Sequence, residues 1–320
     1  MTKKLIILLF IITGGIDVDA QSQVIFASKN FDHYLQNIAY AGLEGKTVFT
    51  IVHRDQWAAF NGRPINQQFQ FNMPLLRLKS AMGLAMFHES IGLQNSFGLR
   101  PSFNKIFLSK RILYSIGIGG SYSRINYNFS KAITPEGIYS NSVFDHQEPF
   151  FIDNYKNTSI LGINLAFWIQ SKWLEGGISF QSLKTLSSKI NPDLRNLAIL
   201  TLTNEYKLSD LWRFRPIIHV YTNLFQNQIE LFSNLNYNGK IFGGIGIRGI
   251  QRNSLDAIQF SFGYEIFPKI VLCATVESRI SPVSEKKFGL TQEFGLKYSF
   301  SNKREFERQR GIDYNPRWMD

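Results

Sequence analysis

Apolar and polar residues alternate along most of this 320-residue chain, a pattern that predicts β-strands with two different faces. In the segment 290–300, every second residue from Leu290 to Phe300 is apolar or aromatic except Gln292, and the residues between them are small or polar. Fourteen such segments are predicted as strands, at about 46–54, 66–74, 80–88, 94–107, 111–128, 158–170, 172–183, 196–208, 214–224, 227–237, 240–250, 255–266, 269–279 and 290–300. An even number of strands is typical of an all-β transmembrane antiparallel β-barrel, in which lipid contacts one strand face and the lumen the other.

The long connections between these strands all fall in one of the two sets of links, those after odd-numbered strands. Links after even-numbered strands are short, and Asn238-Gly239 is a strong signal for a two-residue hairpin. The longer links all follow odd-numbered strands, at 55–65, 129–157, 184–195 and 280–289. Barrels of this class have short periplasmic turns and longer extracellular loops, so the pattern predicts that both chain termini face the periplasm.

An export signal precedes the first strand. Lys3 and Lys4 are followed by an unbroken apolar run at 5–12, and small residues at 18 and 20 predict cleavage before Gln21. No later window is long and apolar enough for a transmembrane helix. The sequence is therefore divided into a signal peptide at 1–20, an N-terminal periplasmic or plug segment at 21–45, a barrel at 46–300 and a charged periplasmic tail at 301–320.

Composition and charge agree with a barrel in contact with outer-membrane lipid. The chain has 28 Phe, 13 Tyr and 5 Trp, which suit aromatic girdles at the two membrane interfaces. The single cysteine, Cys273, excludes a secreted scaffold held by intramolecular disulfides. The net charge of +11 comes from scattered Lys and Arg, which favours charges at the membrane rim and in the lumen over nucleic-acid binding.

Catalytic and cofactor motifs receive little support. Gly244 to Gly249 have the G-x-G-x-x-G spacing, but the run lies inside a predicted strand, whereas dinucleotide binding requires a helix directly after the glycines. The five histidines show no metal-ligand spacing. By spacing alone His88 or His219 could belong to a hydrolase, yet no other residue supports one. We therefore predict no catalytic residues, no cofactor and no metal.

Two segments near the N-terminus, 31–42 and 54–64, interrupt the alternation. They resemble the motifs F-x-x-Y-x-x-N-P-A-Y-A-G and R-x-Q-W-x-x-F-x-G-x-P of the PorP/SprF family of the type IX secretion system, in the same order and spacing. The matching residues are Asn37, Ala39, Tyr40, Ala41, Gly42, Arg54, Gln56, Trp57, Phe60, Gly62 and Pro64. Ile38 replaces the proline that the family typically has, which predicts a less rigid turn before Ala39-Tyr40.

The resemblance implies a non-enzymatic outer-membrane component of the secretion and gliding machinery of Bacteroidetes-type bacteria. It also implies two kinds of partner: periplasmic ring proteins and lipoproteins of the system, and the C-terminal domain of large secreted adhesins that need export or surface anchoring. From the alternation alone, a porin-like channel for small molecules is the alternative function.

The candidate partner-binding residues lie in the segments where the alternation fails. Asn37 and Tyr40 are expected at the periplasmic mouth or inside the lumen as part of a plug. The first outward loop is interpreted either as a docking site in the barrel mouth or as an interfacial girdle, and its candidates are Arg54, Gln56, Trp57 and Phe60. The long loop 129–157 is interpreted as a protein-contact surface, and its candidates are Tyr139, Phe144, Phe150 and Phe151.

Overall fold

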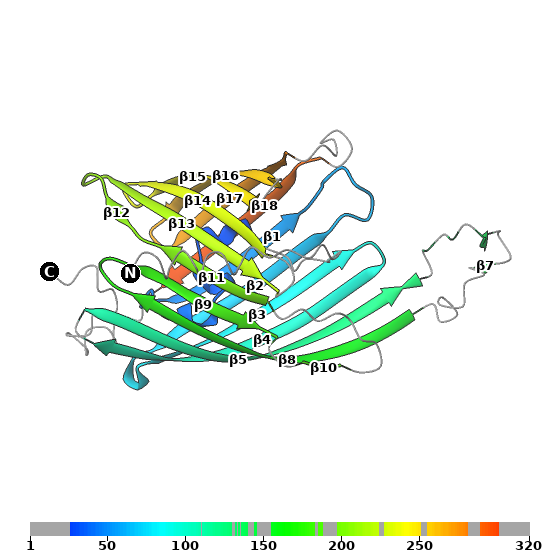
Figure 1. Cartoon of the computed structure of the whole chain (residues 1–320), viewed down its shortest axis with the longest axis horizontal. Coiled ribbons are helices and arrows are strands. Elements are labelled where there is room, and N and C mark those ends of the chain that lie inside the picture. The colour runs from blue at the N-terminus through cyan, green and yellow to red at the C-terminus, as the bar shows by residue number, and fades with distance from the viewer. Residues whose placement is uncertain are drawn as a thin grey trace, which may run out of the picture.

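The computed structural model describes residues 26–109, 111–129, 132, 134, 136–139, 144–145, 155–182, 185–187, 197–223, 227–250, 255–280 and 289–300. Hydrogen-bonded neighbours follow one another around a closed antiparallel barrel, because β1 pairs with β18 and β8 pairs with β9 (Figure 1). The fourteen barrel strands are β1 (Thr47–Asp55), β2 (Ile65–Leu75), β3 (Ser80–Ile91), β4 (Gln94–Ser109), β5 (Ile112–Asn128), β8 (Tyr155–Gln170), β9 (Glu175–Gln181), β11 (Leu197–Thr203), β13 (Trp212–Thr222), β14 (Asn227–Tyr237), β15 (Ile241–Ile250), β16 (Ala257–Phe267), β17 (Ile270–Arg279) and β18 (Thr291–Phe300). The predicted fold class and strand count are confirmed.

Four short strands complete the sheet pairings. β10 (Thr185–Ser187) pairs with β8, and β12 (Tyr206–Lys207) pairs with β13, so each continues the wall beside a barrel strand. β6 (Ile138–Tyr139) and β7 (Phe144–Asp145) form a separate hairpin (Figure 1). The predicted strand 196–208 is thus divided after Thr203 into β11 and β12.

The barrel exposes its apolar residues and buries its polar ones. In β18 the side chain of Phe294 is 56% exposed, whereas that of the preceding residue, Glu293, is 1% exposed. In β16 Phe260 and Phe262 point outward, whereas Gln259 is fully buried in the lumen. This arrangement is the reverse of a water-soluble β-sheet protein and suits a wall surrounded by lipid. No helix in the described part of the chain is long and apolar enough to cross a membrane.

The connections between consecutive barrel strands lie at two opposite ends of the barrel, because neighbouring strands are antiparallel. We call the end that holds the first residue of β1 and the last residue of β18 the turn end, and the opposite end the loop end. The connection after β14 lies at the turn end and contains three residues, Asn238 to Lys240, because Tyr237 pairs with Ile241. The Lys240 N–H nonetheless donates to the carbonyl of Tyr237 at 3.1 Å, so Asn238 and Gly239 form the predicted two-residue turn and Lys240 adds one residue to the link. Both Asn238 and Gly239 take positive φ, as this tight turn requires.

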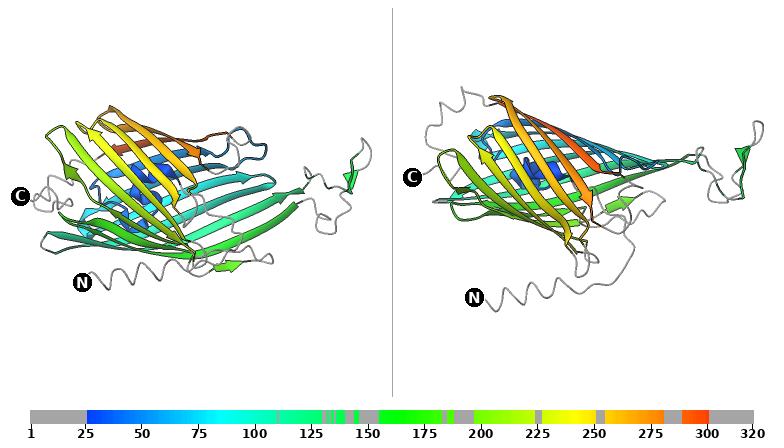
Figure 2. Two further views of the ribbon diagram at one scale, coloured as in Figure 1. Left: turned by 45° about the horizontal axis from the view of Figure 1, so that its top comes forward. Right: turned by 90° about the horizontal axis from the view of Figure 1, so that it is seen from above.

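The barrel wall is uneven in height. β4, β5 and β8 have 16, 17 and 16 residues, whereas β9 and β11 have 7 each. About ten residues are enough for a tilted strand to cross a membrane. The long strands therefore project beyond the rest of the wall at the loop end, towards the β6–β7 hairpin (Figure 2).

Candidate functional site: the occupied lumen

Residues 26–45, which we call the plug, run through the lumen from its loop-end half to the turn end (Figure 2). They form three 3₁₀ turns, η1 (Ala27–Asn30), η2 (His33–Leu35) and η3 (Ile38–Tyr40). Asp32 and Asn37 cap the second and third turns, because their side chains accept hydrogen bonds from the backbone N–H groups of Tyr34 (3.0 Å) and Ala39 (2.9 Å). Nearly all plug residues are buried against the inward faces of the strands.

The first turn is held by two buried carboxylates of the wall. The backbone N–H groups of Ala27 and Ser28 donate to the carboxylate of Glu293 at 2.8 and 2.6 Å. The amine of Lys29 lies 2.5 Å from the carboxylate of Glu230, and both side chains are fully buried. Burial lowers the pKa of Lys29, and the neighbouring carboxylate of Glu230 opposes this shift.

Arginines of the wall extend this contact into a charge network. Arg54 in β1 reaches Glu277 (2.6 Å) and Glu293 (3.2 Å), and Arg248 in β15 reaches Glu277 (2.9 Å) and Glu230 (3.6 Å). Together with Lys29, three cations face three carboxylates, so the buried charges balance. The network joins the plug to β1, β14, β15, β17 and β18.

The middle of the plug is fixed by polar contacts on several sides. The carboxylate of Asp32 accepts hydrogen bonds from Thr50 and Gln70, both at 2.6 Å. The hydroxyl of Tyr34 lies 2.9 Å from that of Ser102 in β4. On the far wall, the amide of Gln36 donates to the hydroxyl of Tyr221 in β13. These hydrogen bonds attach the plug to β1, β2, β4 and β13, which lie on different sides of the lumen.

The last turn packs against an aromatic cluster near the turn end. The ring of Tyr40 meets the rings of Trp168 and His33 edge to face, with centroids 5.0 and 5.1 Å apart. The side-chain amide of Asn37 donates to the carbonyl of Phe167 at 3.2 Å. The amide of Asn104 donates to the carbonyls of Ala39 and Ala41, at 3.1 and 3.0 Å. Both motif residues Asn37 and Tyr40 are thus inside the lumen.

Ile38 occupies the first position of η3, directly after the cap Asn37. This is the helical position that best accommodates proline, because its N–H has no partner within the turn. The Asn37 cap and the hydrogen bond from the Tyr40 N–H to the Asn37 carbonyl (3.0 Å) form with isoleucine at this position, and Ile38 is buried in the hydrophobic cluster around Trp168. Packing of the Ile38 side chain therefore supports this turn, for which the sequence predicted less rigidity because isoleucine replaces the family's proline.

Two glycines let the plug approach the wall closely. Gly42 has φ +70°, and a Cβ on it would lie 2.5 Å from the Cβ of Ala81. A Cβ on Gly117 in β5 would lie 3.0 Å from the backbone nitrogen of Ala39. Gly120, on the same strand, has nothing within 4 Å of its Cβ position.

We expect Gly117→Ala to loosen the plug, because the new methyl group meets the plug backbone rather than a flexible side chain. Overpacking of this kind costs about 1–3 kcal/mol. The measurement is the rate of tryptic cleavage after Lys29 in the folded protein, which should rise. Gly120→Ala is the matched control on the same strand and should leave the rate unchanged; equal rates in both variants would contradict the packing shown by Gly117.

The first outward loop lies over the rim of the loop end. Gln56 and Pro64 close it by a backbone hydrogen bond of 3.0 Å, and Ala58 donates to the carbonyl of Leu290 at 3.1 Å. Trp57 takes φ +61°, and the guanidinium of Arg279 lies 4.9 Å from the centre of its ring. These contacts connect the loop to β18 and to the end of β17.

The candidate residues of this loop have different environments. Arg54 is buried in the charge network, so the interpretation of it as an interfacial girdle residue is wrong. Gln56 and Trp57 are half-buried at the rim, and Phe60 is exposed. The structure therefore brings Arg54 close to the plug, through Glu293, and leaves the other three residues at the surface of the loop end.

Two candidates of the long loop, Tyr139 and Phe144, lie on a hairpin apart from the plug. Tyr139 and Phe144 pair with each other in the β6–β7 hairpin (Figure 1). Phe150 and Phe151 lie outside the described residues. The predicted signal peptide 1–20 and tail 301–320 also lie outside them. Among the described residues no group of His, Cys, Asp or Glu could hold a metal ion.

The sequence interpretation missed the wall residues that hold the plug: Glu230, Arg248, Glu277 and Glu293. A signal for them was present, because each charged residue occupies a polar position of a strand whose other face is apolar. In a strand that crosses a membrane, a charge on the lumen face requires water or a partner.

The fold and the site together define a membrane β-barrel whose lumen is occupied by its own N-terminal segment. The profile of the type IX secretion system membrane protein PorP/SprF family matches residues 20–298. The chain belongs to this family, and the resemblance of the two N-terminal motifs is confirmed. It is therefore a type IX secretion component of the outer membrane.

Solved structures share the barrel architecture at low sequence identity. The KdgM porin is 9% identical with a TM-score of 0.39, over 79% of this chain and 99% of that one. Omp33 of Acinetobacter baumannii is 10% identical with a TM-score of 0.43, over 80% of this chain and 99% of that one. No curated protein sequence matches this chain.

Proposed function

We propose that this protein is a non-enzymatic docking barrel of the type IX secretion system. In this proposal it assists the export or surface anchoring of large adhesins by binding their C-terminal domain, and it contacts ring proteins and lipoproteins of the system in the periplasm. Family membership supports a role in the secretion system. The occupied lumen is the observation that carries the docking role, because a plug held on many sides suits a binding surface better than a diffusion pathway.

The orientation that fits this proposal places the turn end in the periplasm and the loop end at the cell surface, as in barrels of this class. The last residue of β18 would then face the periplasm. The first described residues, Phe26 to Ser28, lie in the loop-end half of the lumen. Of the two termini that were expected in the periplasm, the proposal therefore keeps only the C-terminus there.

The docking surface that we propose is the rim formed by the first outward loop. Phe60 is 43% exposed there, and Trp57 lies beside it on the same loop. An exposed aromatic residue on a loop that is fixed by backbone hydrogen bonds can contact a partner with little loss of conformational entropy. The proposed surface does not include Arg54, because that side chain is buried.

We expect Phe60→Ala to weaken capture of an adhesin's C-terminal domain by about tenfold, because truncating a residue that anchors an interface costs more than about 1 kcal/mol and tenfold corresponds to about 1.4 kcal/mol. The measurement is co-purification of that domain with the full chain from solubilised outer membranes. Phe103→Ala is the matched control: Phe103 is 44% exposed, on the lipid-facing side of β4, and its loss should not change capture. No capture by the unchanged protein, together with steady channel conductance, would overturn the docking proposal.

A further inference from the structure

Exposed Lys and Arg residues surround the turn end of the barrel. Six links join consecutive barrel strands at this end, from the link β2–β3 to the link β16–β17. Because the barrel is closed, these links lie on all sides of the turn end (Figure 2). Each link contains an exposed cation. One from each link forms the set that we call the turn-end cations: Lys79, Arg111, Lys172, Lys207, Lys240 and Lys269.

Few carboxylates offset this charge. Among the described residues of the turn end, Asp210 is the only exposed acid, and it forms an ion pair with Lys207 at 2.6 Å. Of the half-buried acids there, Glu44 and Glu205 have ion pairs of their own, which leaves Glu265. The other five turn-end cations form no ion pair within the described part of the chain. This end of the barrel is therefore an unneutralised ring of positive charge.

Exposed apolar side chains lie beside these cations. Leu78, Trp173 and Phe267 are 59%, 82% and 62% exposed, and each lies within two residues of a turn-end cation. On the outer wall next to these links, the rings of Trp212 and Tyr237 lie 4.8 Å apart, and both side chains are exposed. Trp and Tyr favour the level of lipid headgroups, and a Lys beside them reaches the charged groups of the same layer. The links thus combine an apolar anchor with a cation.

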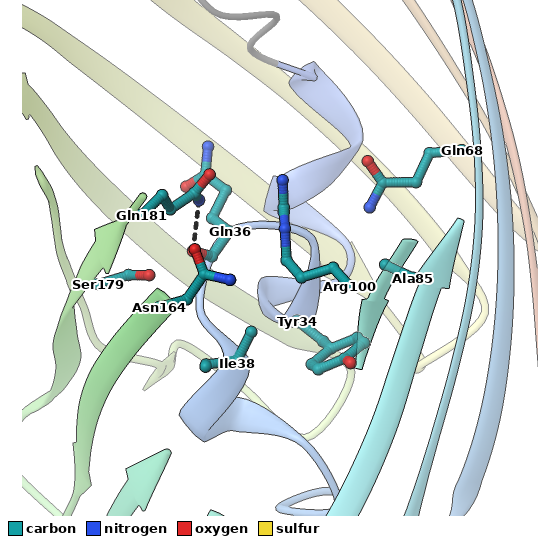
Figure 3. Close-up of a pocket in the computed structure, with 9 residues that line it drawn as sticks. All are labelled: Tyr34, Gln36, Ile38, Gln68, Ala85, Arg100, Asn164, Ser179 and Gln181. Atoms are coloured by element: carbon teal, nitrogen blue, oxygen red, sulfur yellow. Dashed lines mark hydrogen bonds between the residues drawn. The ribbon is translucent and has the colours of Figure 1, made fainter. Parts of the chain in front are cut away.

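The lumen offers an anion no comparable position. Arg100 has no ion pair among the described residues, but the cavity beside it has a volume of about 10 Å³, with room for about one water (Figure 3). The turn-end cations lie instead on the outer surface, where a headgroup can reach them.

We propose that the turn-end cations bind the phosphate groups of anionic phospholipids in the membrane leaflet at this end of the barrel. A leaflet surrounds the whole barrel, as these cations do, whereas a protein docked on one side would leave the cations of the other side unpaired. Lys and Arg near a membrane surface are attracted by anionic lipids, and the apolar anchors hold them at that level. Residues 301–320 contain five Lys or Arg and four Asp or Glu, so their composition does not neutralise the ring.

This binding does not depend on an adhesin, because the docking surface proposed above lies at the loop end. In the orientation that we propose, the leaflet in question is the periplasmic one. The ring would then fix the depth of the barrel in the membrane by charge at one end, in addition to the apolar wall.

The test counts the phospholipids that stay bound to the full chain. The protein is reconstituted in vesicles of equal amounts of phosphatidylglycerol and phosphatidylcholine and extracted in detergent, and the retained lipids are counted by native mass spectrometry. We expect phosphatidylglycerol to be retained about fivefold over phosphatidylcholine, which is the attraction of a single Lys or Arg near an anionic surface. The triple variant Lys172→Gln, Lys240→Gln, Lys269→Gln should lose most of this preference.

The matched control is the triple variant Arg63→Gln, Arg124→Gln, Arg279→Gln, which removes the same charge at the loop end and should keep the preference. Heat-modifiable migration on gels shows that each variant is folded. Equal loss in the two triple variants would overturn the proposal, because net charge and not the turn end would then select the lipid. Equal retention of the two phospholipids by the unchanged protein would also overturn it, and would leave the ring to an acidic protein of the periplasm.

Discussion

Removal of residues 21–45 is expected to turn a closed barrel into an open channel. A fourteen-strand barrel is wide enough to leave an aqueous lumen when nothing fills it. The carboxylates that hold the plug, Glu230 and Glu293, would then face water and would no longer need buried partners. The measurement is single-channel conductance in planar bilayers, where we expect steady currents at least roughly tenfold above those of the full chain.

The control for this deletion is the full chain in the same bilayers, with heat-modifiable migration used to confirm that both proteins are folded barrels. A folded deletion variant that stays closed would show that segments other than the plug block the lumen. A full chain that conducts steadily would contradict the occupied lumen and would favour the porin-like alternative.

The alternation of apolar and polar residues predicted the barrel well because it depends only on the two environments that each strand contacts. Membrane lipid faces one side of every strand and the lumen the other, so the pattern in a segment such as 290–300 does not depend on its neighbours. Whether a strand is interrupted depends instead on the strands that pair with it. β11 ends at Thr203 and the wall continues in β12, a break that the sequence of 196–208 does not reveal.

The contacts of the plug could not be predicted because they join residues that are distant in sequence. Lys29 and Glu230 are 201 positions apart, and Ala27 and Glu293 are 266 positions apart. They meet only after the barrel has closed through the pairing of β1 with β18. The family motif pointed to Asn37 and Tyr40, but whether these residues lie in the lumen or at its mouth required the structure.

The motif also pointed to Arg54 without indicating its role. Its position near the outer end of the first strand favoured an interfacial or docking residue, and the structure corrects this. The parity of β1 places Arg54 on the same face as Thr50 and Val52, which point into the barrel. The strand face on which a charged residue lies is therefore a better guide to its role than its distance from a loop.

Arg54→Ala is expected to destabilise the folded barrel by about 3–5 kcal/mol, the usual cost of removing one partner from a buried ion pair. Arg54 is 3% exposed and pairs with Glu277 and Glu293. Glu277 keeps Arg248 and Gln259 as partners, whereas Glu293 would keep, within the described part of the chain, only the hydrogen bonds from the backbone N–H groups of the plug. The measurement is equilibrium unfolding by guanidinium in lipid vesicles, followed by tryptophan fluorescence.

The matched control is Arg63→Ala, because Arg63 pairs with Asp55 at the surface, with 37% and 23% of their side chains exposed. An exposed pair contributes at most about 1 kcal/mol, so the two arginine variants should differ clearly in their free energy of unfolding. Equal effects would show that the charge network does not stabilise the fold.

A double variant tests the reason for the effect. Glu293→Gln removes the charge that Arg54→Ala leaves without a partner, while its amide oxygen can still accept from the plug. If the uncompensated charge causes the loss, Arg54→Ala with Glu293→Gln should lose less stability than the sum of the two single variants. Additive losses would mean that Arg54 stabilises the barrel by packing alone, and the plug would then be held chiefly by hydrogen bonds and by the cluster around Trp168.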